Sequence, residues 1–126
     1  MRVLVCGGRN FLDKERAFAA LDLLHAGPRP ITRIIQGGAN GADYLAQRWA
    51  NERGISSEEF VAHWQAEGRA AGPLRNQRMI SQGKPDLVLA FPGGRGTADM
   101  VRRAKSAGIE VISPSPISSP DRRAGG

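Results

Sequence analysis

The feature that most constrains the fold of this chain is a repeated alternation of short apolar runs with segments of helical periodicity. Residues 2–6 form an apolar run that ends at Gly7 and Gly8, which is typical of a buried strand. In residues 13–26 the apolar side chains recur at helical spacing, and Gly27 and Pro28 end that pattern. The beginning of the chain therefore predicts a strand, a loop and a helix.

The alternation continues to residue 112. Further strands are predicted over 32–36, 59–64, 86–91 and 109–112, and further helices over 42–53, 73–82 and 97–107. Helical connections between strands favour right-handed crossovers and a parallel sheet that is covered on both faces. The predicted fold class is α/β, a three-layer sandwich with a mainly parallel five-stranded sheet in the order 3-2-1-4-5, the simplest doubly wound arrangement.

A chain of 126 residues has the length of one domain. We expect a ligand-binding domain over 1–112 and a flexible tail rich in Ser, Pro and Gly over 113–126. No stretch approaches the roughly 18 to 20 apolar residues that cross a bilayer, and the first residues do not resemble a signal peptide. A cytoplasmic protein with no membrane partner is therefore expected. The single Cys6 and two distant histidines form no metal signature, so neither a metal nor another cofactor is expected.

The charge of the chain predicts anionic partners. The formal net charge is +6, and the basic residues are mostly arginine. A guanidinium donates two parallel hydrogen bonds to a phosphate or a carboxylate, which an ammonium does not. The charge alone does not distinguish a small anion from a polymeric one.

Three glycine-rich loops follow three of the predicted strands. Because the carboxyl ends of parallel strands meet at one edge of a sheet, we expect these loops to converge there. Glycine lets a ligand approach the backbone, and a helix start offers unpaired N–H groups to a phosphate. The residues expected to bind ligand at this edge are Gly7, Gly8, Arg9, Asn10, Gly37, Gly38, Asn40, Gly41, Asp43, Pro92, Gly93, Gly94, Arg95, Gly96 and Thr97.

The spacing of these loops weighs against two common nucleotide enzymes. None of them matches G-x-G-x-x-G, and none matches G-x-x-x-x-G-K-[ST]. An NAD-dependent oxidoreductase and a P-loop ATPase are therefore poor interpretations of this chain.

Other side chains complete the candidate site. Arg75, with Asn76 beside it, can bind phosphate through its guanidinium, or it is a solvated surface arginine. Trp64, at the predicted end of the third strand, can stack on a base or only pack against the protein. Asp43 can accept hydrogen bonds from ribose hydroxyls, or it only favours the start of its helix.

Four motifs taken together resemble the SLOG superfamily, and within it the YspA, cpYpsA-related branch. They are residues 7–9 (GGR), 37–43 (GGANGAD), 72–79 (GPLRNQRM) and 92–100 (PGGRGTADM). The resemblance covers about residues 1–112 and implies a Rossmann-like fold that binds nucleotides or nucleotide-derived ligands. It also implies that two copies of the chain pair, as LOG-type relatives in this superfamily do.

A more distant resemblance is to the LOG-type cytokinin riboside 5'-monophosphate phosphoribohydrolases, which carry R-K-x-x-M and P-G-G-x-G-T-x-x-E. Arg75 and Met79 match the first motif, with Asn76 in the place of the lysine, and residues 92–97 match the second. Met100 stands where the second motif has its acidic residue. The carboxylate that would stabilise an oxocarbenium-like centre or position water is therefore missing from its place.

Asp99 is the nearest replacement for that carboxylate, but it lies about 100° round a helix from position 100. With Arg75 it forms the candidate catalytic pair of a hydrolase. Alternatively, Asp99 is an acid in the first turn of its helix, where the helix dipole favours it. We expect Met100 to belong to the core, because with Val101 and Ala104 it forms an apolar stripe.

Three functions follow from these observations. The first is a binding module that senses or sequesters a nucleotide-derived small molecule. The second is a phosphoribohydrolase that cleaves the N-glycosidic bond of a nucleoside 5'-monophosphate. The third, binding of single-stranded nucleic acid, has the least support, because the arginines are scattered and few aromatic residues are available to stack on bases.

Overall fold

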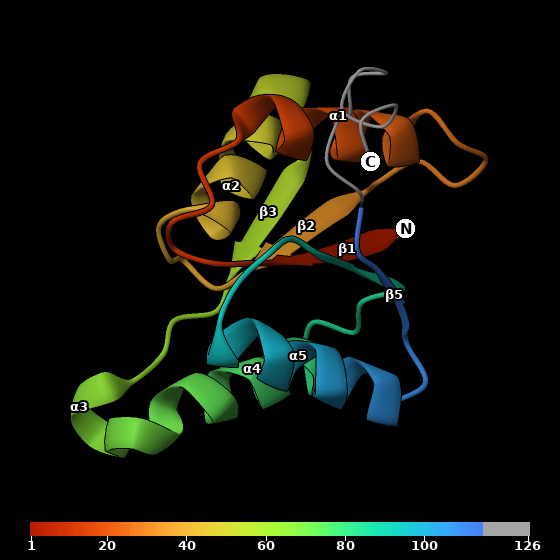
Figure 1. Cartoon of the computed structure of the whole chain (residues 1–126). Helices are drawn as coiled ribbons and strands as arrows, with labels where there is room; N and C mark the ends of the chain where they lie inside the picture. Colours follow the sequence, from red (N-terminus) through yellow and green to blue (C-terminus); the bar gives the residue numbers. More distant parts are fainter. Residues whose placement is uncertain (115–126) are drawn as a thin grey trace, which may run out of the picture.

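The computed structural model describes residues 1–114, in which five strands form one parallel sheet between two layers of helices (Figure 1). The sheet has the order β3-β2-β1-β4-β5. The strands are β1 (Arg2–Cys6), β2 (Arg33–Gln36), β3 (Ser56–Glu59), β4 (Leu87–Ala90) and β5 (Glu110–Ile112). Every pair of neighbouring strands is parallel, which confirms the predicted fold class and strand order.

Helices α1 and α2 cover one face of the sheet, and α4 and α5 cover the other (Figure 1). The helices are α1 (Lys14–His25), α2 (Ala42–Arg53), the short α3 (Trp64–Glu67), the 3-10 turn η1 (Gly68–Ala70), α4 (Ala71–Ser81) and α5 (Arg95–Ser106). Strands β2 and β3 extend the sheet on one side of the central β1, and β4 and β5 extend it on the other side, so the winding of the sheet reverses between β1 and β4. In sheets of this kind the crevice beyond the carboxyl ends of the strands lies at that switch point.

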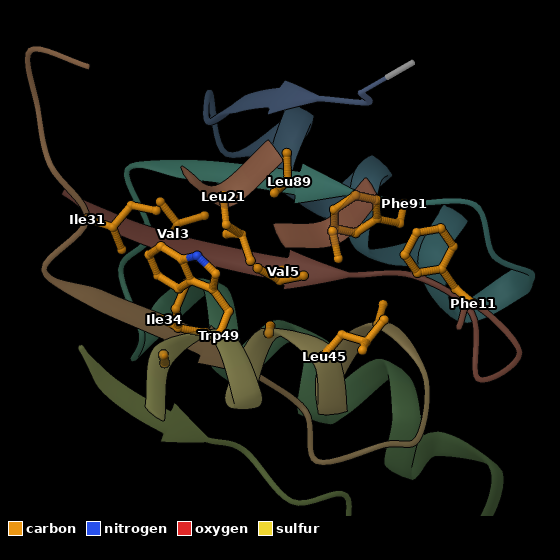
Figure 2. Close-up of a cluster of buried hydrophobic side chains, with 14 of the residues drawn as sticks. Val3, Val5, Phe11, Leu21, Ile31, Ile34, Leu45, Trp49, Leu89 and Phe91 are labelled. Atoms are coloured by element: carbon orange, nitrogen blue, oxygen red, sulfur yellow. The ribbon is translucent and has the colours of Figure 1, made fainter. Parts of the chain in front are cut away.

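The core under α1 and α2 is built around two aromatic residues that are almost completely buried, Trp49 and Phe91 (Figure 2). Phe91 stacks on Phe11 with 4.7 Å between the ring centroids. The indole Nε1 of Trp49 donates a hydrogen bond to Asp22 Oδ1 at 2.8 Å, and Arg53 of α2 binds both oxygens of the same carboxylate. This polar contact ties α1 to α2 at the edge of an otherwise apolar layer.

The core on the opposite face contains Met100 and Cys6, which the sequence predicts to be buried, together with Met79. Met100 is 1% exposed and packs with Ala104 against the sheet, which confirms that it belongs to the core. Cys6 is also buried, and burial, with a smaller effect from the charge of Asp43, raises the pKa of its thiol to about 12. Cys6 is therefore a neutral thiol at physiological pH.

The third strand lies earlier in the chain than predicted. Strand β3 ends at Glu59, opposite the last residue of β2. The N–H of Phe60 still donates to the carbonyl of Gln36 at 2.9 Å, but residues 61–63 have no neighbouring strand to pair with. Its sequence is polar because it forms an edge of the sheet and most of its side chains are exposed. The apolar residues that suggested a strand over 59–64 instead lead into α3, so Trp64 begins a helix rather than ending a strand.

Two helices begin earlier than predicted. Helix α4 starts at Ala71, so Pro73 lies within its first turn, where a missing N–H costs no helical hydrogen bond. Helix α5 starts at Arg95 rather than at residue 97. Asp99 consequently lies in the second turn of α5, and the interpretation of Asp99 as a first-turn acid is wrong.

The predicted tail over 113–126 lies almost entirely outside the described residues. At its start, the carbonyl of Pro114 accepts a hydrogen bond from Arg16 Nη2 at 2.8 Å. Within residues 1–114, none of the helices has the length and apolar character that a bilayer span requires.

Candidate functional site

A pocket of about 1050 Å³ opens at the carboxyl ends of the central strands. This volume lies slightly above the roughly 300 to 1,000 Å³ that is typical of small-molecule sites. The glycine loops after β1, β2 and β4 border it, together with α3 and α4. The sequence-predicted residues that line this pocket are Gly7, Gly8, Arg9, Gly37, Gly38, Asn40, Asp43, Trp64, Arg75, Asn76, Gly94, Arg95, Gly96, Thr97 and Asp99.

Four predicted residues lie outside the pocket lining: Asn10, Gly41, Pro92 and Gly93. Three of them hold the loops together. The carbonyl of Pro92 accepts a hydrogen bond from the N–H of Gly8 at 2.8 Å. A Cβ on Gly93 would lie 2.7 Å from that same nitrogen, and Gly41, at a φ of +76°, packs on the backbone of Arg9. These residues fix the shape of the site from behind.

The N-terminus of α5 opens into the pocket without a group of the protein to cap it. Its N-cap is Gly94, no side chain caps the helix, and its first turn has no acidic residue. A Cβ added to Gly94 or Gly96 would meet no atom within 4 Å, so the space above this turn is open. Unpaired N–H groups and the positive end of the helix dipole make such a turn suited to an anion.

The N-terminus of α2 already has a carboxylate beside it. Asp43, in the first turn, is 8% exposed and accepts a hydrogen bond from the N–H of Ala39 at 3.2 Å. Burial raises the pKa of Asp43 to about 6, although the Ala39 N–H and the charge of Arg75 act in the opposite direction. Asp43 therefore lies both at the helix start and in the pocket wall, so the two interpretations of this residue are compatible in geometry.

Arg75 reaches into the pocket from α4 with its guanidinium fixed by two hydrogen bonds. Its Nη1 donates to the carbonyl of Gly37 at 2.9 Å, and its Nε donates to Asn76 Oδ1 at 3.1 Å. A Cβ on Gly37 would lie 2.9 Å from the guanidinium carbon, so only glycine leaves room for this contact. The half-buried Arg75 is thus held in one orientation rather than free in solvent.

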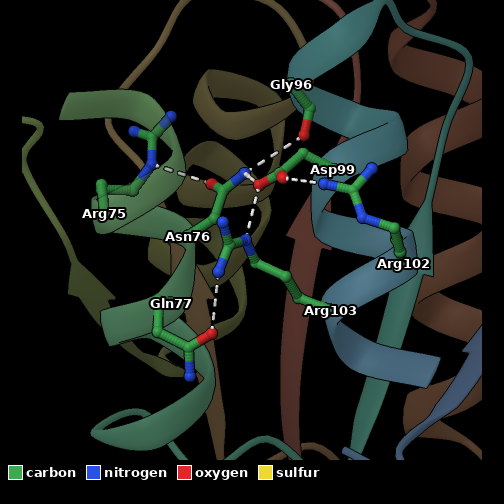
Figure 3. A network of polar contacts seen from close by, with 7 residues as sticks. All are labelled: Arg75, Asn76, Gln77, Gly96, Asp99, Arg102 and Arg103. Carbon is green, nitrogen blue, oxygen red and sulfur yellow. Dashed lines mark hydrogen bonds and ion pairs between the residues drawn. The ribbon is translucent and has the colours of Figure 1, made fainter. Parts of the chain in front are cut away.

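Asn76 connects α4 to the beginning of α5 (Figure 3). Its buried Nδ2 donates to the carbonyl of Gly96 at 3.2 Å and to Asp99 Oδ2 at 3.0 Å. Arg103 Nε donates to the same Oδ2 at 2.8 Å, and Arg102 binds the other carboxylate oxygen. Asn76 is therefore a structural link between the helix that carries Arg75 and the open turn of α5.

The same contacts limit the chemistry of Asp99. Burial opposes the charge of its carboxylate, but the hydrogen bonds from Arg103 and Asn76 outweigh burial and lower its pKa. Both carboxylate oxygens have partners within the protein. An ionised carboxylate that is engaged in this way is a poor proton donor and is poorly placed to activate water.

Sequence reasoning missed several pocket residues, of which Glu59 is the most informative. Glu59 ends β3, and its carboxylate lies against Gly38, where a Cβ would approach it to 2.7 Å. The buried Gln36 fixes the same corner: its Oε1 accepts from the N–H of Gly38 at 2.6 Å. Placing the third strand at 56–59 would have identified Glu59 as a strand-end residue. The other missed polar residues are Arg69 and Arg102.

Trp64 lies at the rim of the pocket with 53% of its surface exposed. Val61 is also exposed and lines the same part of the wall. An exposed indole beside an open pocket is available to stack on a planar ligand. In the part of the chain that the structure covers, 1–114, no three His, Cys, Asp or Glu side chains gather as a metal site would require.

The fold and the pocket define a Rossmann-like α/β protein with a phosphate-compatible site at its switch point. Residues 1–66 match the model of the family described as YAcAr, the YspA, cpYpsA-related SLOG family, and the chain belongs to this family. The Gene 61 protein of Mycobacterium phage D29 is 42% identical over 119 residues, covering 88% of this chain and 94% of that protein. The predicted family is thereby confirmed.

Two solved structures share the fold. DNA processing protein A (DprA) from Streptococcus pneumoniae superposes with a TM-score of 0.73 and 18% identity, covering 92% of this chain and 51% of that one. TM1055 superposes with a TM-score of 0.67 and 18% identity, covering 88% of this chain and 72% of that one. The present chain thus spans about half the length of DprA. At such low identity these likenesses concern the fold alone.

Proposed function

We propose that this protein binds a nucleotide or a nucleotide-derived ligand, for sensing or sequestration, with a phosphate group at the N-terminus of α5. The observation that carries this proposal is the uncapped first turn of α5, which opens into the pocket at Gly94 and Gly96. A helix start of this kind attracts phosphate through its N–H groups and its dipole. Membership of the SLOG family supports a nucleotide-derived ligand.

The surrounding residues suit the other parts of such a ligand. Arg75 supplies a fixed positive charge to the phosphate. Asp43, as a carboxylate in the pocket wall, accepts hydrogen bonds from ribose hydroxyls. Trp64, exposed at the rim, stacks on the base.

The experiment is a thermal-shift screen with nucleoside monophosphates, NAD, ADP-ribose and cyclic nucleotides, followed by chromatography of the same samples. A ligand of this protein raises the melting temperature and is recovered intact. Gly94→Val and Arg75→Ala are expected to abolish the shift, whereas Arg48→Ala, on the far side of α2 from the pocket lining, is a control that keeps it. A screen in which no nucleotide shifts the protein would contradict the proposal.

A second candidate function is hydrolysis of the N-glycosidic bond of a nucleoside 5'-monophosphate. The observation that favours it is the buried Asp43, whose pKa of about 6 allows proton exchange near neutral pH inside the pocket. In this function Asp43, rather than Asp99, acts on the ribosyl centre or its attacking water. Free base that accumulates with wild-type protein but not with Asp43→Asn would establish it, and recovery of only intact ligand would exclude it.

A further inference from the structure

Four of the five arginines that line the pocket form no ion pair with a carboxylate among residues 1–114, unlike most of the other arginines. Within residues 1–114, the arginines paired with Asp or Glu are Arg29, Arg33, Arg48, Arg53, Arg78, Arg102 and Arg103, of which only Arg102 lines the pocket. The pocket arginines without such a partner are Arg9, Arg69, Arg75 and Arg95. Elsewhere in this range only Arg2 and Arg16 share this property. Arginines without an ion-pair partner are therefore concentrated around the pocket, whose lining carries five arginines and the three carboxylates of Asp43, Glu59 and Asp99.

Arg9 and Arg75 contact the two ends of the same glycine loop, since Gly41 packs on the backbone of Arg9 and the carbonyl of Gly37 accepts from Arg75 Nη1. Burial is the main cause that lowers the pKa of Arg75, and the positive charges of Arg78 and Arg9 lower it further, against the attraction of Asp43. The contact with the Gly37 carbonyl prevents Arg75 from turning away. An anion that lies between Arg9 and Arg75 would relieve this repulsion.

The position of Arg9 is adjacent to the open turn of α5. The N–H of Gly8 donates to the carbonyl of Pro92, and a Cβ on Gly8 would lie 3.2 Å from the Cα of Gly93. Arg9 directly follows Gly8, and Gly94 directly follows Gly93. The candidate anion position between Arg9 and Arg75 and the candidate anion position at the N-terminus of α5 are therefore neighbours along one wall of the pocket.

We propose that the ligand carries two neighbouring phosphate groups, one at the N-terminus of α5 and the other between Arg9 and Arg75. This inference rests on the proposed function and adds to it the class of nucleotide. A nucleoside diphosphate and a pyrophosphate-bridged compound such as ADP-ribose share the required chemistry. The pocket of about 1050 Å³ has room for either.

The test is titration calorimetry at pH 7.5 and constant ionic strength with AMP, ADP and ADP-ribose. Because hydrogen bonds to charged groups contribute about 1.5 to 3 kcal/mol, we expect ADP, ADP-ribose or both to bind about tenfold to a hundredfold more tightly than AMP. Arg9→Gln is expected to reduce this ratio, since it removes one ligand of the second phosphate. Arg9→Lys, which keeps the charge, is expected to restore part of it.

The control variant is Arg48→Gln, which removes an arginine that is paired with Glu52 and lies outside the pocket lining. It is expected to leave the ratio unchanged. Preference for ADP over ADP-ribose would indicate a terminal phosphate, and the reverse preference a bridged pyrophosphate; either supports the inference.

Three outcomes would overturn the inference. If AMP binds as tightly as ADP and ADP-ribose, the second phosphate site does not exist, although the proposed function stands. If Arg9→Gln weakens all three ligands by the same factor, Arg9 does not act on a second phosphate. If none of the three ligands binds at millimolar concentration, the inference is wrong, and if no other nucleotide of the screen shifts the protein, the proposed function is wrong as well.

Discussion

At the scale of single residues, the ionisation of Asp43 is coupled to the fold. Burial raises its pKa from 3.8 to about 6. The folded protein therefore binds this proton more tightly than the unfolded chain does. The contribution of Asp43 to stability is fully present below pH 3.8 and is lost as the pH rises through 6.

Asp43→Asn is accordingly expected to stabilise the protein at neutral pH. Asparagine can still accept the hydrogen bond from Ala39, but it carries no buried charge. The raised pKa corresponds to at most about 3 kcal/mol of unfolding free energy at pH 7.5, and the gain should fade towards pH 4. Urea denaturation at both pH values measures this difference.

Asp22→Asn provides the opposite control for that experiment. Hydrogen bonds from Arg53 and Trp49 lower the pKa of Asp22, so its charge favours the folded state at neutral pH. The variant is expected to be less stable than the wild type at pH 7.5. If Asp43→Asn changed the unfolding free energy equally at pH 7.5 and pH 4, burial of a charge would not explain its effect.

The neighbouring glycines of the β4 loop are expected to differ sharply on substitution by alanine. The methyl group of Gly93→Ala would lie 2.7 Å from the nitrogen of Gly8, so the variant should lose about 1 to 3 kcal/mol of unfolding free energy. The methyl group of Gly94→Ala meets open space, so its stability should change by less than about 0.5 kcal/mol.

Substitution of Gly94 is expected to affect ligand affinity rather than stability. Because Gly94 lines the pocket, Gly94→Ala is expected to weaken phosphate binding in a fully folded protein. Denaturation and calorimetry on the same samples measure both quantities. Equal losses of stability for the two variants would show that the loop packing is described incorrectly.

At the scale of elements, the link between α4 and α5 depends on Asn76. Removing this buried side chain leaves Arg75 without the acceptor of its Nε and Gly96 without a donor. Asn76→Ala is therefore expected to lower the unfolding free energy by about 1 to 3 kcal/mol, measured by urea denaturation. The variant should also weaken phosphorylated ligands more than the corresponding nucleosides.

Gln77→Ala is the matched control on the next residue of α4. Gln77 is exposed and makes one side-chain contact with Arg103, at 3.0 Å. Its removal should change stability by less than about 0.5 kcal/mol. A control that is as destabilised as Asn76→Ala would mean that the α4–α5 surface as a whole, rather than the Asn76 link, determines the effect.

The elements also show how far sequence patterns determine this fold. The central β1 and β4 are buried on both faces, so their apolar runs predicted them well. The edge strand β3 is polar, and nothing in its own residues distinguishes it from a loop. Its position is fixed by pairing with β2, which is a tertiary contact that local periodicity does not contain.

At the scale of the whole molecule, the glycine loops could be placed at one edge because parallel topology determines where strands end. The exact lining of the pocket could not be predicted from topology. Glu59 and Arg69 line the pocket because they belong to β3, which was predicted too late in the chain, and to the segment that follows it. Gly41 and Gly93 face neighbouring backbone rather than the pocket, a distinction that depends on distances between segments far apart in sequence.

We propose, from the likeness to LOG-type relatives, that two copies of the chain pair. Light scattering at working concentration should then give twice the mass of 13.5 kDa. The exposed Leu74, which lies outside the pocket lining, offers apolar surface for such a contact. A mass of one chain would contradict pairing and leave the binding site as described.

Phosphate binding at the first turn of α5 can be observed in a ¹⁵N–¹H correlation spectrum titrated with the best nucleotide from the screen and with its unphosphorylated nucleoside. We predict that the largest shifts fall on the backbone amides of Arg95, Gly96 and Thr97, in the first turn of α5, and that the nucleoside does not produce them. Nucleotide-induced shifts that spare this turn, or the same shifts with the nucleoside, would contradict it.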